Sequence, residues 1–436
     1  MATTEDGEPA QGKGAKIALR QLVKDTVKMG QAAGLSLSEL RGIALYDMRK
    51  DEKIQALESF ATAASKIVDL PRFVESFGAD EAPRMALQFV YQYFERGHVM
   101  SYSEEVFESI YDDLLKELES PVWVFRGVAN VRYFTSDVHH VHLDDGVTIR
   151  GRSPADLASS GFGTPIWDRI TEDWSGLGAS SFVLIAEHSI PKNPDNLILM
   201  DSYQLGVKAM RAILALRLCG EGSVGIGPMW VIRSARFNVG IGGISRAGAS
   251  IPTMGTYFKW TPTMSANYSA IYDGVKQLEE EGFKASPGNL SVALRAFSST
   301  YDRWPTAQDS QLIDCVTVLE ALLGGENEIA FKLSFRVASI LADTDEERRN
   351  LLKLLKDFYN TRSRVIHGAN LQAKHQTLLQ RVDELRNIVK RLLVAFIRLG
   401  NTKPAEYGKK FWQEKLDGTL VDIVERERLR VALGLS

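Results

Sequence analysis

The hydrophobic positions between residues 16 and 120 repeat every three or four residues, which is the spacing of one face of a helix. Ser103 precedes one of these stripes, and its hydroxyl suits the N-cap of a helix. Residues 1–15 are rich in Gly, Ala and acidic residues and carry no such repeat. We therefore predict a flexible tail over 1–15 and a helical region over 16–120. The two clearest stripes are Leu87, Val90, Tyr91 and Phe94, and Val106, Ile110, Leu114 and Leu118.

The pattern changes at Pro121, where short apolar runs bounded by Gly, Pro or Asn replace the helical repeat. One helix interrupts these runs between residues 203 and 218, with Val207, Met210, Leu214 and Leu218 at helical spacing, and Gly220 is its expected stop. Asp145 and Gly146 predict a tight turn. We predict an α+β module over 121–285, a candidate sensor. Its strand candidates are residues 122–125, 128–134, 147–149, 182–186, 197–200, 229–232 and 237–241.

Beyond residue 286 the apolar positions return to helical spacing. Helices with short connections favour an antiparallel bundle, which we place over 286–403, followed by a helical tail over 404–436. The expected fold class is α+β multidomain, with an N-terminal helical region, a central α+β module and a C-terminal helical bundle. The expected bundle helices are residues 308–323, 328–342, 345–366 and 374–399, and the tail helix is 408–433.

The composition is that of a soluble globular protein, since 44% of the 436 residues are hydrophobic, 25% are charged and the formal net charge is -3. This charge gives no general attraction for nucleic acid, so an RNA contact requires a local basic patch. Cys219 and Cys315 lack CxxC partners, which argues against a disulfide framework or a zinc ribbon. The longest apolar run, residues 392–397, is too short to span a membrane. We expect a cytoplasmic protein without membrane contact.

The densest group of residues suited to catalysis lies between Tyr359 and Gly368. RNA carries its own nucleophile, the 2′-hydroxyl, so a protein that cleaves RNA needs one group that transfers protons and one that stabilises the charged phosphorane. Histidine titrates near neutral pH and suits the first task. Arginine can bind two phosphate oxygens at once and suits the second. Residues 345–400 also carry 12 Lys and Arg against 6 Asp and Glu, a local net charge of +6 that would attract RNA phosphates.

Two arginines compete for the second task. Arg362 lies five residues before His367, and on an ideal helix these side chains point about 140° apart. They would share a face only if the helix ended near His367, and Gly368 is a usual stop. Arg364 lies three residues before His367 and would share its face on a regular helix.

Three ordered blocks, residues 312–323, 328–338 and 358–368, precede an amphipathic helix over 385–399. Together they resemble the HEPN superfamily, in particular its ApeA-like branch, over residues 290–400, about a quarter of the chain. The resemblance implies a metal-independent endoribonuclease that needs no cofactor and leaves a 2′,3′-cyclic phosphate and a 5′-hydroxyl. It also implies a homodimer in which two copies of the motif face one cleft, and a role in bacterial defence or as a toxin, with a phage-derived trigger. By resemblance, Arg362 and His367 are the catalytic pair. The resemblance does not specify tRNA, rRNA or mRNA as the substrate.

Other residues of these blocks have expected supporting roles. We expect Tyr359 and Asn360 to orient the motif or the phosphate, and Ser363 stands where other branches often have Asn, Asp or His. We expect Glu320 and Arg336 to form a buried ion pair between two helices of the bundle. The alternative function is a HEPN-derived module that binds RNA or a nucleotide, or dimerises, without catalysis.

Two other sequence features suggest sites but have simpler interpretations. His140 and His142 would point the same way on a strand, with His139 beside them, as ligands of a zinc-dependent hydrolase could. No further Cys or His follows at a useful spacing, so we favour an exposed strand end and predict no metal. Residues 220–225 spell G-x-G-x-x-G but lead from a helix into a strand, the reverse of a dinucleotide-binding turn. We interpret them as a helix stop and a turn, and the glycine-rich residues 240–246 as a loop without the ending of a P-loop.

Overall fold

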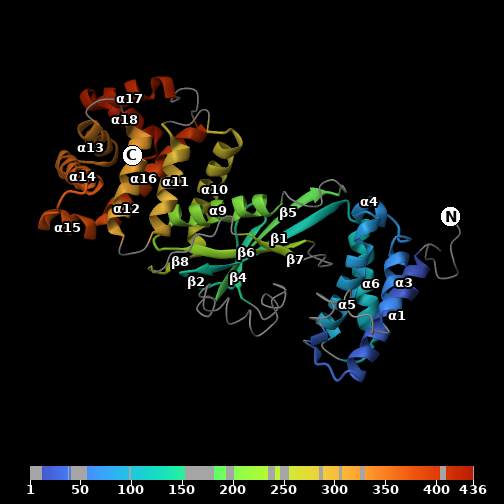
Figure 1. Ribbon diagram of the computed structural model, residues 1–436. Coiled ribbons are helices and arrows are strands. Elements are labelled where there is room, and N and C mark those ends of the chain that lie inside the picture. The colour runs from blue at the N-terminus through green and yellow to red at the C-terminus, as the bar shows by residue number, and fades with distance from the viewer. Residues whose placement is uncertain are drawn as a thin grey trace.

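The computed structural model shows an elongated molecule (Figure 1). The N-terminal helices form one end, an antiparallel sheet lies in the middle, and the C-terminal helices form the other end. This arrangement confirms the coarse prediction of a mixed fold of helices and strands with a helical C-terminal region. The described residues are 12–37, 39–40, 56–97, 100–152, 181–192, 201–233, 241–245, 255–283, 288–303, 307–324, 329–402 and 409–435.

The N-terminal helices pack through the apolar stripes that the sequence predicts. Val90, Phe94 and Ile110 are fully buried, and the Ser103 hydroxyl accepts a hydrogen bond from the Val106 amide at 3.4 Å. The N-cap predicted at Ser103 is therefore confirmed. The helices of this region are α1 (Lys13–Ala32), α3 (Ala56–Ile67), α4 (Phe73–Phe77), η1 (Ala79–Glu81), α5 (Ala82–Gly97) and α6 (Glu104–Glu119).

The predicted tail over 1–15 is too long at its C-terminal end. Helix α1 already begins at Lys13, and Ala15 is fully buried. The Tyr111 hydroxyl donates a hydrogen bond to the Gly12 carbonyl at 3.2 Å, which ties the start of α1 to α6. The burial of Ala15 and this hydrogen bond hold in place a segment that composition alone assigned to a tail. Residues 1–11 lie outside the described residues.

Six antiparallel strands form the central sheet, in the order β3-β4-β5-β1-β6-β7. The candidate 122–125 and most of 128–134 belong to one strand, β1, which continues to Arg132 because both of its neighbours pair along it, whereas Phe134 begins β2. Asp145 and Gly146 have φ of 60° and 74°, so the predicted tight turn is confirmed. Residues 197–200 and 237–240 lie outside the described residues. The strands are β1 (Val122–Arg132), β2 (Phe134–Ser136), β3 (His140–His142), β4 (Val147–Gly151), β5 (Phe182–Pro191), β6 (Gly225–Arg233), β7 (Ile241–Ser245) and β8 (Phe258–Trp260), of which β2 and β8 form a separate parallel pair.

A buried aromatic joint connects the N-terminal helices to the sheet. Trp123 of β1 is fully buried, and its ring meets Phe77 of α4 edge-on at 4.5 Å. The Lys192 ammonium lies 4.5 Å from the centroid of the Trp123 ring and donates a hydrogen bond to the Glu117 carbonyl. An edge-on pair of rings and a cation above an indole ring are each stable only over a narrow range of relative positions of the two side chains. These contacts therefore position the helical end against the sheet.

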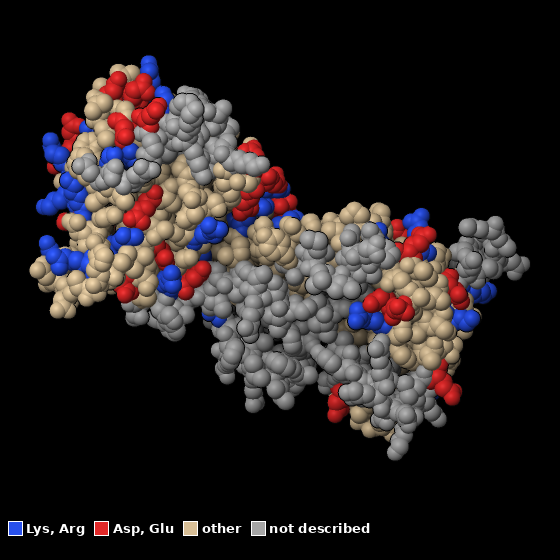
Figure 2. Space-filling view, turned by 45° about the horizontal axis from the view of Figure 1, so that its top comes forward, with Lys and Arg blue, Asp and Glu red and all other residues tan. Residues whose placement is uncertain are grey.

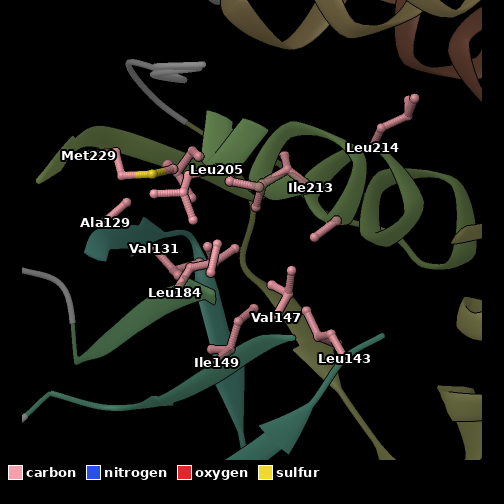
Figure 3. Close-up of a cluster of buried hydrophobic side chains, with 14 of the residues drawn as sticks. Ala129, Val131, Leu143, Val147, Ile149, Leu184, Leu205, Ile213, Leu214 and Met229 are labelled. Atoms are coloured by element: carbon pink, nitrogen blue, oxygen red, sulfur yellow. The ribbon is translucent and has the colours of Figure 1, made fainter. Parts of the chain in front are cut away.

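Helix α9 (Asp201–Cys219) covers one face of the sheet (Figure 3). Leu205 and Ile213 of α9 lie over Val131 and Leu184 of the strands, and all four side chains are buried. Full burial of such side chains stabilises the fold by about 1.5–3 kcal/mol each. The helix ends at Cys219, so the stop predicted at Gly220 is confirmed. The next helical elements are η4 (Pro262–Met264) and α10 (Ser265–Glu280), which packs on α9 and on the C-terminal helices.

Two helices predicted as single elements near the C-terminus are each divided. The stretch 374–399 breaks at Arg381, and the stretch 408–433 breaks at Asp422, whose carboxylate accepts a hydrogen bond from the Val424 amide at 2.7 Å and so caps a new helix. Across the described residues, no helix is both long enough and apolar enough to cross a membrane. The C-terminal helices are α11 (Leu290–Asp302), α12 (Gln308–Leu323), α13 (Ile329–Leu341), α14 (Asp345–Ile366), α15 (Ala373–Gln380), α16 (Val382–Thr402), α17 (Lys409–Val421) and α18 (Ile423–Ala432).

Helices α17 and α18 pack on α13. Arg336 of α13 is buried, and its Nη2 lies 2.5 Å from Asp417 Oδ1 of α17. Arg430 of α18 is also buried and donates to the carbonyls of Ile340 and Ala342 at 2.8 and 2.9 Å. Each guanidinium satisfies acceptors that would otherwise be buried unpaired. Residues 409–435, predicted as part of a separate tail, thus belong to the packed helices.

Both cysteines are free thiols in weakly reactive surroundings. Cys315 is buried and Cys219 is half-buried. Burial raises the pKa of each thiol to about 12. The thiolate is the nucleophilic form, so neither cysteine is suited to nucleophilic catalysis at neutral pH.

Two glycines lead to opposite predictions for stability. Gly222 has φ of +121°, and an added Cβ would lie 2.6 Å from the backbone of Phe258, so Gly222→Ala should lower the free energy of unfolding. We expect a loss of about 2–5 kcal/mol. Gly418 lies within α17 with no atom within 4 Å of an added Cβ, so Gly418→Ala should raise the same free energy by about 0.5–1 kcal/mol. Urea titrations followed by circular dichroism measure both changes. Equal effects of the two substitutions would contradict the tight approach of Gly222 to Phe258.

Candidate functional site

Helix α14 carries most of the predicted site residues and starts at a complete capping box. The Thr344 hydroxyl accepts a hydrogen bond from the Glu347 amide at 3.1 Å, and the Glu347 carboxylate accepts one from the Thr344 amide at 3.2 Å. These bonds satisfy two amides at the start of the helix. Leu355, Phe358 and Thr361 form the buried side of the helix. The opposite side of α14 therefore faces outward.

Helix α14 ends where the sequence predicts. Gly368 has φ of +63°, its amide donates to the Val365 carbonyl at 3.1 Å, and the Ala369 amide donates to the Arg364 carbonyl at 3.0 Å. These two bonds form a Schellman motif, which favours glycine at the left-handed position. His367 is the C-cap and is exposed.

The stop comes too late to turn His367 toward Arg362. The His367 amide still donates to the Ser363 carbonyl at 3.1 Å, as it would in a continuing helix. Arg362 and His367 therefore remain about 140° apart around the axis of one chain. The convergence that the Gly368 stop suggested does not occur within one chain. Arg364 and His367 are both exposed and, three residues apart on a regular helix, share a face.

Arg362 is held by a carboxylate and an aromatic ring. Its Nη2 lies 3.2 Å from Glu320 Oε2 of α12, and its Cζ lies 5.8 Å from the centroid of the Tyr359 ring. The Arg362 Nε is buried and has no hydrogen-bond partner in the described part of the chain. A guanidinium has five N–H donors, and only Nη2 is engaged by the described residues. The Nη1 donors can bind phosphate oxygens, whereas the buried Nε is out of their reach.

The prediction that Glu320 and Arg336 pair with each other is wrong. Glu320 pairs with Arg362, whereas Arg336 pairs with Asp417 and donates to the Leu323 carbonyl at 2.5 Å. Asp417 lies 81 residues after Arg336, so only the packing of α17 on α13 brings the two together. Glu320 therefore belongs to the candidate site, where it orients Arg362.

The supporting residues differ in their surroundings. Burial raises the pKa of the Tyr359 hydroxyl, and the negative charge of Glu320 raises it further. The hydroxyl therefore stays protonated at neutral pH and can donate a hydrogen bond. Asn360 is exposed and Ser363 is half-buried, and neither side chain forms a hydrogen bond with another described residue.

His375 is a residue of this region that sequence reasoning missed. It lies in the first turn of α15, which packs on α14, and its side chain is buried. Its Nδ1 accepts a hydrogen bond from the Gln372 amide at 3.3 Å. Burial lowers the pKa of His375, and the positive charges of Arg364 and Lys374 lower it further. The imidazole of His375 therefore favours its neutral form near the positive charge of Arg364. No spacing rule could reveal His375, because a loop separates this residue from the motif in α14.

Positive side chains gather at the outer end of the C-terminal helices. Figure 2 shows Lys and Arg along the edge where α13, α14 and α15 lie in Figure 1, with some Asp and Glu among them. Arg364 of α14 and Lys374 of α15 are exposed cations of this region. A surface of this kind attracts phosphate groups.

The histidines near β3 lie together on the sheet. His140 and His142 are exposed on the same side of the strand, with ring centroids 6.4 Å apart. Within the described ranges, no group of three or more His, Cys, Asp or Glu residues is placed to hold a metal ion. Both rings are exposed, as expected for side chains of a strand at the solvated edge of the sheet.

No protein-family model, no curated protein and no solved structure matches this chain. The function must therefore be inferred from the chemistry and geometry of the site itself.

His375 should make folding sensitive to acid. Its pKa is lowered in the folded protein, so the unfolded chain binds the proton more tightly. Stability should fall as the pH drops through the unfolded value of about 6.5 toward the lower folded value. The stability advantage of the wild type over His375→Gln should therefore shrink between about pH 7.5 and about pH 5. Urea titrations across this range measure the difference, and a difference independent of pH would refute the role given to His375.

Proposed function

We propose that this protein is a metal-independent endoribonuclease whose site is built on the last turns of α14. The observation that carries the proposal is the arrangement around Arg362. Its guanidinium is held at Nη2 by Glu320, keeps its Nη1 donors for a ligand, and lies on the same helix end as the exposed His367. Arg364 and Lys374 add positive charge in the same region, where they lower the pKa of His375. These are the groups that RNA cleavage by its own 2′-hydroxyl requires.

In the proposed reaction, the 2′-hydroxyl attacks the adjacent phosphorus, and a histidine accepts the proton that it loses. The donors of Arg362 stabilise the charge on the phosphorane. The bond from phosphorus to the 5′-oxygen then breaks, and that oxygen takes up a proton. The products are a 2′,3′-cyclic phosphate and a 5′-hydroxyl. His367 is the proposed proton-transfer group because its imidazole is exposed and the described residues provide it with no hydrogen-bond partner.

The orientation of the pair favours a site shared by two copies. Arg362 and His367 point about 140° apart on one chain. Both side chains can reach the same phosphate most directly if one copy supplies the arginine and the other copy supplies the histidine. Phe331 of α13 and Ile366 of α14 are 45% and 47% exposed, and an apolar contact between copies would cover such side chains. We therefore propose a homodimer in which His367 of each copy faces Arg362 of the other.

A second candidate function is an RNA- or nucleotide-binding module without catalysis. The Glu320–Arg362 ion pair favours it, because a carboxylate beside the guanidinium offsets part of the charge that the phosphorane needs. Binding without cleavage in the assay below would select this function.

RNA cleavage in the presence of EDTA tests the nuclease directly. Purified protein should cleave tRNA or total RNA, and His367→Ala should lower the rate about 10²–10⁴-fold because proton transfer is lost. Arg362→Ala should lower it about 10²–10³-fold because phosphorane stabilisation is lost. Gel electrophoresis of labelled RNA measures both rates.

Lys353→Ala is the matched control, because Lys353 is an exposed cation elsewhere on α14. It should leave the rate unchanged. If Arg364→Ala abolishes cleavage while Arg362→Ala does not, the arginine role belongs to Arg364. For the wider role in defence or as a toxin, inducible expression with and without phage challenge compares the wild type with His367→Ala, and equal growth inhibition by both would exclude the ribonuclease as the cause.

Heterodimers test whether two copies share each site. A dimer of Arg362→Ala with His367→Ala retains one intact pair if the residues act across copies, so it should recover about half of the wild-type rate. Co-expression with two different tags isolates this heterodimer, and light scattering confirms its mass. A heterodimer as inactive as either parent would show that the two residues act from the same chain.

A further inference from the structure

A polar pocket lies between two loops, one after α9 and one before β8, and the C-terminal helices, and it includes no residue of α14. One side is lined by the turn at residues 220–223 and by residues 255–256. The other side is lined by α11, α12, α16 and the junction of α15 with α16. Its volume is about 370 Å³, which suits a bound small molecule. We refer to this cavity as the interlobe pocket.

Two cations of α16, Arg386 and Lys390, line the interlobe pocket, and the neighbouring negative groups offset their positive charges only in part. Arg386 and Lys390 are four residues apart, so they lie on one face of the helix and repel each other. Arg386 pairs with Asp383 at 2.5 Å, but the Asp383 side chain is 82% exposed, and the Arg386 Nε is buried without a partner among the described residues. Lys390 donates a hydrogen bond to the Gly220 carbonyl. Burial lowers the pKa of Lys390, and the negative charge of Glu221, which also lines the pocket, offsets part of this shift. An anion between the two side chains would stabilise both.

Other polar and charged groups surround Arg386 and Lys390. Arg217 and Arg386 lie 4.5 and 5.0 Å from the centroid of the Tyr301 ring, so a third, fully buried cation, which pairs with Asp302, stands behind the pocket. Much of the remaining lining can both donate and accept hydrogen bonds. These groups include the amides of Gln308, Gln311, Gln380 and Asn387 and the hydroxyls of Ser223 and Thr256.

We propose that the interlobe pocket binds a small organic phosphate, with the phosphate on Arg386 and Lys390 and the organic part on the amide side chains. A bare phosphate ion would fill only part of a cavity of about 370 Å³ and would leave the amides unused. Nucleotides and sugar phosphates share the required chemistry. The bound molecule contacts both the turn after α9 and the C-terminal helices, and so stabilises the folded protein. This site is separate from Arg362 and His367 and does not depend on ribonuclease activity.

Calorimetric titration of the full chain tests the site with defined probes. The probes are the common ribonucleoside 5′-monophosphates, ribose 5-phosphate, inorganic phosphate and adenosine. At least one organic phosphate should bind more tightly than both inorganic phosphate and adenosine. Tighter binding of a nucleotide than of ribose 5-phosphate identifies a nucleotide ligand, and the reverse order identifies a sugar phosphate. Absence of binding by every organic phosphate at about 1 mM would overturn the proposal.

Variants locate the bound phosphate. Arg386→Gln should weaken binding by about tenfold or more, because a charge-assisted hydrogen bond is lost. Asp383→Asn should strengthen binding, because it removes a repelling carboxylate that is exposed and so contributes little to folding. This second variant tests the site even if Arg386→Gln does not fold. Arg362→Ala should bind as the wild type does, and a loss of binding there would place the phosphate at α14 and refute the interlobe site.

Discussion

Helix α9 is buried along most of its length, and the sheet meets the C-terminal helices around it. One side covers β1, β5 and β6, and the other packs against α10 and α16. Arg217, near its end, is fully buried, with its Nε donating to the Val224 carbonyl at 2.8 Å and its Nη2 lying 3.4 Å from Asp302 Oδ1. A buried guanidinium deprived of such partners would cost several kcal/mol. The turn after α9 and the helix α11 must therefore keep their places, which fixes the interlobe pocket between them.

Short-range signals in the sequence predict many element boundaries correctly. They do not identify the core positions of an element that is buried on several sides. The N-cap at Ser103 and the stop at Gly368 each depend on a few neighbouring residues, and both occur where expected. For α9, the sequence indicates a stripe that includes Val207 and Met210, yet these two are only half-buried whereas Leu205 is fully buried. A helix covered on several sides has apolar residues all round, so no single stripe identifies its core.

For the candidate site, the sequence predicts the types of residue but not their partners. Arg362 and His367 can be proposed from their chemistry, because an arginine and a histidine beside a helix stop suit phosphate chemistry wherever they occur. The partner of Arg362 is Glu320, 42 residues away, and it is set by the packing of α12 against α14. His375 enters the region only because α15 folds back onto α14. Contacts of this range depend on the whole arrangement of helices.

The positive charge along residues 345–400 does not form one surface. Arg386 and Lys390 face the interlobe pocket, and Arg391 donates a hydrogen bond to the Leu341 carbonyl at 3.4 Å. The cations left beside the motif belong to α14 and α15, so the charge available there is smaller than the count along the sequence. A single chain would therefore contact few RNA phosphates, and salt would weaken such binding only slightly. Two copies joined at the motif would double these contacts. In the proposed homodimer, the same pairing would also bring an arginine and a histidine that diverge on one chain to a common phosphate, so that charge and geometry would act together at the proposed site.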